Sequence, residues 1–328
     1  MSGAAVEQPL YGPYGGLSEE LAGAAKASNV NAVWFHMFQE EQFERCDRYG
    51  LAPCVELKTF RADFSKRPEL IPIGIDGRPM RYGSLVQGVC LSHPDFIEEI
   101  EESLSTGLRR FAPAGVWLDY LTYSGWFETA EPDLQESCFC RSCVQEFCSA
   151  TGLDADSPAE ILARHRSAWT GHKCVRIAAY GARFASLVRE ARPGCVVGAY
   201  MCPWRPDEYD GALGRIFAQD YALLAPSIDV FTPLIYAAKS GRGAGWAAEL
   251  LEASPGFLPA GRRMQLILDY LDYPSSMLAM LSSAVPSHGM QIYGGSRIFS
   301  DPVAARELGE AVSRSREDVR TSEAHRES

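Results

Sequence analysis

Three features that would point to particular partners are missing from this sequence. It has no cluster of Lys and Arg, and its 31 basic and 42 acidic residues give a net charge of −11. Such a chain is poorly suited to a nucleic-acid backbone or an anionic membrane surface, so a small neutral or cationic ligand is easier to accommodate. No stretch approaches the ~18 apolar residues that span a bilayer, and the N-terminus shows no export-signal pattern. We therefore expect a soluble, cytoplasmic protein.

The fold class follows from the absence of nucleotide-binding glycine motifs and from the alternation of strand-like and helical stretches. Neither a GxGxxG motif nor a P-loop follows the first strand-like run. Apolar runs alternate with amphipathic helical stretches, which predicts either a (β/α)8 TIM barrel or a doubly wound open sheet. The missing glycine cluster, and polar residues at the ends of many strands, favour the barrel. The eight expected strands cover residues 9–11, 31–37, 52–60, 115–121, 195–201, 229–236, 264–269 and 290–293.

A single barrel accounts for nearly the whole chain. The length of 328 residues fits one α/β barrel or two smaller domains, and the alternation continues without a low-complexity linker. We expect one barrel over residues 1–316, with a metal-binding loop after the fourth strand. Residues 317–328 are charged and aperiodic, which predicts a flexible C-terminal tail.

Candidate catalytic carboxylates lie at the ends of the expected strands. Asp119 ends the fourth strand, Asp269 the seventh, and Glu56 lies on the third. Active-site groups of barrels project from these ends, and the fourth and seventh strands are expected to place Asp119 and Asp269 across the mouth from one another. Two opposed carboxylates are what glycoside hydrolysis uses. A helix cap or an ion pair is the alternative interpretation of each one.

Aromatic and polar side chains are expected around these carboxylates. Aromatic faces suit the C–H surfaces of a sugar ring, and tyrosine hydroxyls can bond its OH groups. The alternatives are ordinary packing for the aromatics, mutual pairing for Glu56 and Lys58, and a hydrogen-bonded barrel histidine for His36. The expected substrate-binding residues are His36, Lys58, Tyr120, Trp126, Tyr200, Trp204, Tyr236 and Tyr293.

Four of the ten cysteines form a candidate metal site. Cys138, Cys140 and Cys143 make a CxCxxC arrangement that brings three thiolates within reach of one ion, and Cys90 is expected to approach the same end of the barrel. Four thiolates with no open position predict a structural Zn²⁺. The alternative is a group of reduced, partly buried thiols. Cys148 is expected to be a spare thiol on the helix that follows.

The segment CFCRSCVQEF, with one cysteine upstream, resembles the zinc cluster of family 42 glycoside hydrolases and of uncharacterised glycoside-hydrolase-like barrels. The phrase GVWLDY resembles the strand-four segment of that wider set and of fucosidase- and amylase-type barrels, whose nucleophile is an Asp on this strand. The segment DVFTPLIYA resembles their sixth strand. Family 42 enzymes would present Asn-Glu at strand four and Glu at strand seven, whereas this chain has Leu118-Asp119 and Asp269, which argues against β-galactosidase activity.

These observations predict a glycoside hydrolase acting on a small glycoside. In that prediction Asp119 is the nucleophile or stabilising carboxylate, Asp269 is the acid/base, and Glu56 is the reserve. One alternative is a Schiff-base lyase or aldolase that uses Lys58. Another is a non-catalytic carbohydrate-binding barrel. The expected partner is a small carbohydrate, with no nucleic acid and no membrane, and an oligomer is possible.

Overall fold

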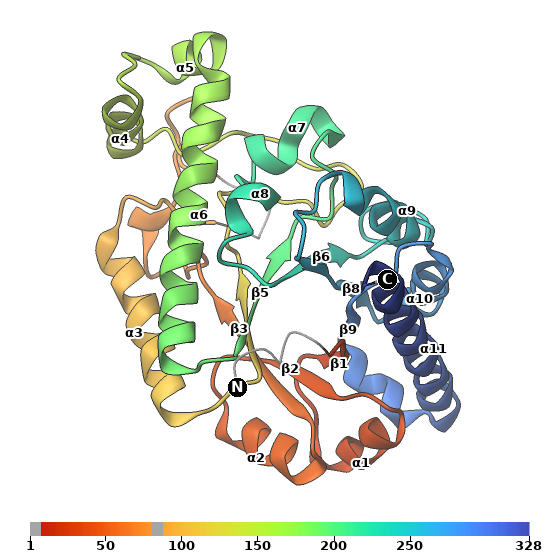
Figure 1. Ribbon diagram of the computed structural model, residues 1–328. Helices are drawn as coiled ribbons and strands as arrows, with labels where there is room; N and C mark the ends of the chain where they lie inside the picture. The colour runs from red at the N-terminus through yellow and green to blue at the C-terminus, as the bar shows by residue number, and fades with distance from the viewer. Residues whose placement is uncertain (1–7, 81–87, 328) are drawn as a thin grey trace.

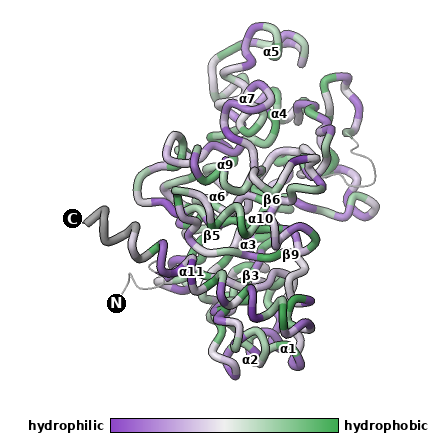
Figure 2. The backbone as a smooth tube through the Cα atoms, turned by 90° about the vertical axis from the view of Figure 1, so that its right-hand side faces the viewer, coloured by the Kyte–Doolittle hydropathy of each residue, from purple (hydrophilic) through white to green (hydrophobic). Residues whose placement is uncertain are grey.

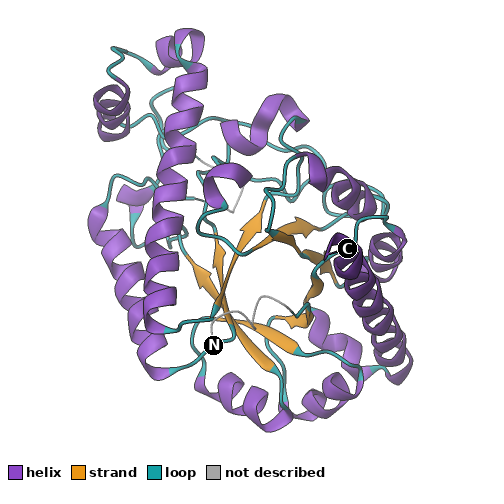
Figure 3. Cartoon of the chain, viewed as in Figure 1, coloured by secondary structure: helices purple, strands orange, loops and turns teal. Residues whose placement is uncertain are grey.

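The computed structural model of the protein describes residues 8–80 and 88–327. Its strands run parallel in the order β5-β4-β3-β2-β1-β9-β8-β6, and β6 pairs back to β5 to close the barrel (Figures 1 and 3). The strands β7 and β8 are consecutive pieces of one barrel strand. The single (β/α)8 barrel predicted from the sequence is therefore confirmed. The strands are β1 (Leu10–Tyr14), β2 (Ala32–His36), β3 (Ala52–Lys58), β4 (Gly115–Asp119), β5 (Val196–Met201), β6 (Val230–Ile235), β7 (Arg263–Met264), β8 (Leu266–Asp269) and β9 (Gly289–Tyr293).

Helices surround the barrel, and α4, α5 and part of α6 project beyond it (Figure 1). Hydrophobic segments gather toward the barrel, whereas hydrophilic stretches are common on the outer helices and loops (Figure 2). The helices are α1 (Glu19–Ala27), α2 (Glu40–Tyr49), α3 (Pro94–Arg110), α4 (Arg141–Thr151), α5 (Pro158–Arg164), α6 (Arg166–Ala191), α7 (Glu208–Arg215), α8 (Tyr221–Leu224), α9 (Trp246–Ala253), α10 (Tyr273–Ser282) and α11 (Pro302–Glu327), with short 3-10 turns at η1 (Pro68–Leu70), η2 (Ser254–Gly256) and η3 (Gly295–Ser300).

Two buried tryptophans pack in the barrel interior. The rings of Trp34 and Trp117 meet edge to face at 5.4 Å, and both are fully buried. Glycines make the room for them: a Cβ at Gly115 or Gly198 would lie 2.4 Å from the Trp117 indole. The indole N–H of Trp117 donates to the Thr232 hydroxyl at 2.9 Å. This packed layer forms a rigid base beneath the C-terminal mouth of the barrel.

The last helix is α11, and the tail expected from residue 317 onward belongs to it. The helix α11 continues through that segment to Glu327. Val312, Ser315 and Val319 recur at three- and four-residue spacing and are buried, which gives the helix an inward face beyond residue 316. No helix within residues 8–80 and 88–327 has the length and apolar character needed to cross a membrane.

Candidate active site

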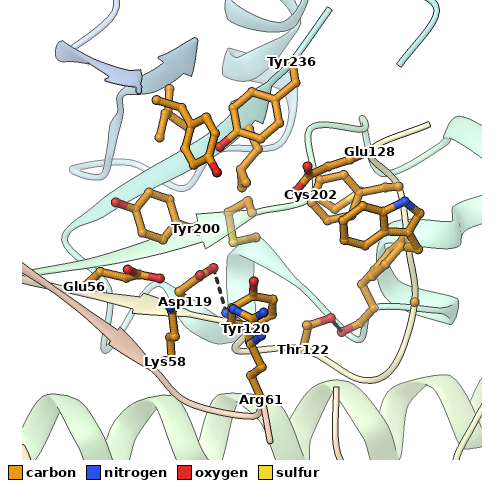
Figure 4. Close-up of a pocket in the computed structure, with 18 of the residues that line it drawn as sticks. Glu56, Lys58, Arg61, Asp119, Tyr120, Thr122, Glu128, Tyr200, Cys202 and Tyr236 are labelled. Carbon is orange, nitrogen blue, oxygen red and sulfur yellow. Dashed lines mark hydrogen bonds between the residues drawn. The ribbon is translucent and has the colours of Figure 1, made fainter. Parts of the chain in front are cut away.

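A cavity of about 430 Å³ opens at the C-terminal ends of the strands (Figure 4). It brings together most of the residues expected from the sequence: Glu56, Asp119, His36, Lys58, Tyr120, Trp126, Tyr200, Tyr236 and Tyr293 all line it. Trp204 does not. It is buried against Phe127, Phe217 and Tyr209, so the structure gives it a packing contact instead of a place in the cavity wall.

The backbone after β4 fixes the direction of Asp119. Tyr120 adopts the left-handed conformation with φ +57°, and its N–H donates to Asp119 Oδ1 at 2.9 Å (Figure 4). The carbonyl oxygen of Asp119 accepts from the backbone N–H of Thr59 at 2.9 Å and from its hydroxyl at 2.7 Å. A left-handed non-glycine residue costs about 1–3 kcal/mol and persists where its surroundings fix it. The carboxyl group is therefore held in one orientation at the cavity floor.

Glu56 and Asp119 form a buried carboxyl pair. Glu56 is fully buried, and its Oε2 accepts a hydrogen bond from His36 Nδ1. Its other oxygen, Oε1, is buried and accepts no hydrogen bond from an N–H or O–H group of the described residues, if the Asp119 carboxyl is ionised. A proton shared with Asp119, which lies within hydrogen-bonding contact, would satisfy it.

The environment assigns that proton to Asp119. Burial, reinforced by the neighbouring Glu56 charge, raises the pKa of Asp119 well above its usual range. Burial opposes ionisation of Glu56 as well, but the hydrogen bonds of Glu56 with His36 and Asp119 outweigh it and lower the pKa of Glu56. These two directions favour a pair in which Asp119 holds the proton and Glu56 is ionised.

Tyrosines form a wall around the carboxyl pair. The rings of Tyr14 and Tyr200 meet edge to face at 5.8 Å, and those of Tyr236 and Tyr293 lie 5.4 Å apart. Burial raises the pKa of Tyr14, Tyr200 and Tyr236, so their hydroxyls stay neutral hydrogen-bonding groups. The Tyr200 hydroxyl is also bonded to the Gln291 side chain at 2.7 Å, which holds the ring in place.

Asp269 lies beside this cavity and does not line it. Its Oδ2 forms an ion pair with Lys239 Nζ at 2.5 Å, and Lys239 itself lines the cavity. The Lys239 ammonium also lies 4.5 Å from the ring centre of Tyr236 and 5.0 Å from that of Tyr293. Lys239 and Asp269 also line an adjoining pocket, which shares residues such as Tyr293 with this cavity. Their ion pair is an arrangement that the strand positions alone did not reveal.

Glu128 is a cavity carboxyl that the sequence analysis did not select. It comes from the long loop after β4 and lies across the cavity from Glu56 (Figure 4). Burial raises the pKa of Glu128; the nearby Lys239 charge opposes this shift and the Asp269 charge adds to it. The only local signal for it was an acidic residue in the aromatic segment YSGWFE.

The four expected cysteines come together as a candidate metal centre. The sulfur atoms of Cys90, Cys138, Cys140 and Cys143 all lie within 4.8 Å of one another. Cys90 Sγ lies 3.6 Å from Cys140 Sγ and 3.9 Å from Cys143 Sγ. Tetrahedral zinc, with Zn–S bonds of about 2.3 Å, separates its sulfurs by about 3.8 Å, so the donor set fits that ion. Cys148 lies outside the group, as expected.

Neighbouring donors favour the thiolate form of the cluster. Ile73 N–H donates to Cys138 Sγ at 3.2 Å, and Cys143 N–H donates to Cys140 Sγ at 3.5 Å. The guanidinium of Arg176 lies 3.6 Å from Cys143 Sγ. A site of four thiolates and one divalent cation carries excess negative charge, which these N–H groups and the guanidinium partly offset.

The cluster connects two loops at the barrel mouth. Cys90 precedes α3, whereas Cys138 and Cys140 come directly before α4 and Cys143 lies in its first turn. Close by, Gly88 packs so tightly on the loop after β4 that a Cβ there would lie 2.6 Å from the backbone of Ser124. The loop that carries Trp126 and Glu128 is therefore fastened at one end by β4 and at the other by the cysteine cluster.

A buried ion network anchors the same loop to α6. Lys173 is fully buried; its ammonium donates to the Arg215 carbonyl at 2.5 Å and lies 3.7 Å from Glu136 Oε2. Glu136 also accepts from the Arg215 guanidinium at 3.3 Å. Burial lowers the pKa of Lys173 from 10.5 to about 8. Removing one member of such a network leaves the others buried without compensation.

Comparison with known proteins supports the barrel fold and shows no activity. No protein-family model matches the chain, and no curated protein sequence matches it. The fold is similar to that of the PgaB (BpsB) glycoside hydrolase domain from Bordetella bronchiseptica, with a TM-score of 0.69 and 14% identity over 89% of this chain and 92% of that chain.

It is also similar to two β-galactosidases. The enzyme from the Antarctic haloarchaeon Halorubrum lacusprofundi has a TM-score of 0.64 and 13% identity over 94% of this chain and 58% of that one. The enzyme from the psychrophilic Marinomonas ef1 has a TM-score of 0.62 and 11% identity over 92% and 59%. This chain thus spans under two thirds of those enzymes. At these identities the likeness shows a shared barrel fold.

Proposed function

We propose that the protein is a glycoside hydrolase that uses two of its carboxyl groups to cleave a small glycoside. The observation that carries this proposal is the buried Glu56–Asp119 carboxyl pair at the floor of an aromatic-lined cavity, at the barrel end where active sites form. A carboxylic acid kept protonated beside a sugar-sized cavity is the group that glycosidic cleavage needs. The fold likeness to a glycoside hydrolase domain supports the same proposal.

Asp119 is the proton donor in this mechanism. Its proton passes to the glycosidic oxygen as the bond to the anomeric carbon breaks, and Glu56 stays ionised under its hydrogen bond from His36. The sequence analysis predicted a nucleophilic or stabilising role for Asp119. The shared proton favours the donor role instead, because a nucleophile has to be ionised before the reaction begins.

Glu128 is the second carboxyl group of the mechanism. It lines the cavity on the side away from the pair, whereas Asp269 is occupied by Lys239. The Glu128 carboxylate attacks the anomeric carbon or activates a water molecule that does so. Asp269, predicted as the acid/base, holds Lys239 against Tyr236 and Tyr293 and is a positioning residue in this proposal.

The cysteine cluster holds a structural Zn²⁺ in this proposal. Four thiolates complete a tetrahedral shell with no open position for substrate or water. When bound, the ion supplies a fixed link between the two loops. The reacting groups come from the cavity side chains alone.

A panel of aryl glycosides tests the function. We expect release of the aryl alcohol from at least one sugar, and we expect Glu128→Gln to lower kcat about 100-fold. Asp269→Asn is the matched comparison and should lower kcat far less. Ligand binding without product from any glycoside would overturn the proposal in favour of a carbohydrate-binding barrel. A larger loss in Asp269→Asn than in Glu128→Gln would return the second role to Asp269.

A further inference from the structure

The cations that line the cavity differ in whether a carboxylate neutralises them. Lys239 pairs with Asp269 at 2.5 Å, and His36 contacts Glu56. Lys58 and Arg61 line the same cavity, yet neither has a carboxylate oxygen within 4.0 Å among the described residues. Lys58 is half-buried and Arg61 is exposed, so both charges are accessible to an anionic group that enters the cavity.

Both cations lie on the wall that carries the proton donor. Lys58 ends β3 directly beside Asp119 in the strand register. Arg61 follows in the next loop, and its guanidinium carbon lies 5.2 Å from the ring centre of Tyr120. Figure 4 shows the two side chains together beneath Asp119 and Tyr120. The stacking on Tyr120 limits the freedom of the Arg61 guanidinium beside the cavity.

The carboxyl pair does not supply the missing negative charge in full. The charge of Lys58 acts on both Glu56 and Asp119, but no oxygen of either carboxyl lies within 4.0 Å of its ammonium, and Glu56 is already hydrogen-bonded to His36. Lys58 and Arg61 therefore leave this wall with an excess of positive charge, although the whole chain carries −11. The overall charge favoured a neutral or cationic ligand, but the charge at this one wall of the cavity is positive, while Glu128 lies on the opposite side.

We propose that Lys58 and Arg61 form a subsite for an anionic group on the sugar, either a carboxylate or a sulfate ester. A guanidinium can bind such a group with two parallel hydrogen bonds, and an ammonium adds a point charge. Since Lys58 lies beside the proton donor, the charged sugar would occupy a position next to the bond that is cleaved. This inference rests on the proposed glycoside hydrolase activity and narrows its substrates to acidic glycosides such as uronides.

Calorimetric titration of monosaccharides tests the subsite without requiring turnover. The probes are D-glucuronate, D-glucose 6-sulfate and D-glucose, each titrated into the wild-type protein at low and high salt. We expect at least one anionic sugar to bind about ten-fold or more tightly than glucose, with a preference that weakens at high salt. The better of the two anionic sugars identifies a carboxylate or a sulfate ester as the natural group. Equal affinities, or no binding of either anionic sugar, would overturn the inference.

Variants locate the effect on the two residues. Lys58→Met and Arg61→Met should each weaken binding of the preferred anionic sugar about ten-fold, and should weaken glucose binding much less. Lys58→Arg, which keeps the charge, should retain most of the affinity. The matched control is Lys66→Met, because Lys66 is 80% exposed and pairs with Asp63 outside the cavity. An unchanged anion affinity in the double variant would contradict the subsite. Anion selectivity that persists without hydrolysis of any glycoside would count against the proposed function alone.

Discussion

The cysteine cluster and the carboxyl pair are both buried polar sites at the barrel mouth, but their surroundings differ. Sulfur atoms of the cluster accept N–H bonds from Ile73 and Cys143 and lie near the Arg176 guanidinium. In the carboxyl pair, Oε1 of Glu56 has a hydrogen-bond partner only if Asp119 donates a proton to it. A site whose negative charge is compensated is suited to holding a structure together. A site that must keep a proton to remain buried is suited to transferring one.

The largest expected effect is on the reacting side of this comparison. Asp119→Asn keeps the shape of the side chain but removes the proton that the pair shares. We expect kcat/KM to fall about 1000-fold while the protein stays folded by circular dichroism. Asp207→Asn is the control, since Asp207 is 80% exposed and is not among the residues that line the cavity. Activity near the wild-type level in Asp119→Asn would exclude it as the proton donor.

The structural side of the comparison is tested through the metal. Protein purified without added metal should contain about one zinc per chain. Cys140→Ser should lose that zinc and lower the free energy of unfolding by about 4 kcal/mol, because a structural metal binds only the folded chain. Cys148→Ser, on the same helix but outside the cluster, should keep both the zinc and the stability. Metal-free wild-type protein would show that the cysteines are reduced thiols.

The buried Lys173 gives a smaller effect with a defined pH dependence. Its pKa is about 8 in the folded protein and 10.5 in the unfolded chain, so between these values the unfolded state binds more protons. Its contribution to the free energy of unfolding therefore rises with pH across this window, by about 3 kcal/mol in total. Chemical denaturation of the wild type and Lys173→Met from pH 7.5 to 10.5 should show this difference in slope. If the free energies of unfolding of the two proteins changed in parallel with pH, the pKa of Lys173 would not be lowered in the folded protein.

The parts of the site that follow from local spacing were predicted well. The CxCxxC segment identified three of the four clustered cysteines, and the apolar run of β4 identified Asp119 as a strand-end carboxylate. Alternating apolar runs identified every barrel strand, because burial inside a parallel barrel leaves a clear pattern in the sequence.

The parts that depend on contacts between distant segments could not be predicted. Lys239 neutralises Asp269 from another strand's loop, and Trp204 turns into a packed cluster of aromatic rings. Glu128 reaches the cavity because its loop is anchored far along the chain, at the cysteines and at Lys173. The spacing of residues along the sequence does not predict such contacts between distant segments.

The central claim is that Glu56 keeps the catalytic proton on Asp119, and the pH dependence of kcat/KM in Glu56→Gln tests it most directly. Removing the neighbouring charge lowers the pKa of Asp119, so the acid loses its proton at lower pH. The account predicts that the alkaline limb of the profile moves to lower pH by about one unit or more relative to the wild type. An alkaline limb that stays in place, or moves to higher pH, would contradict it.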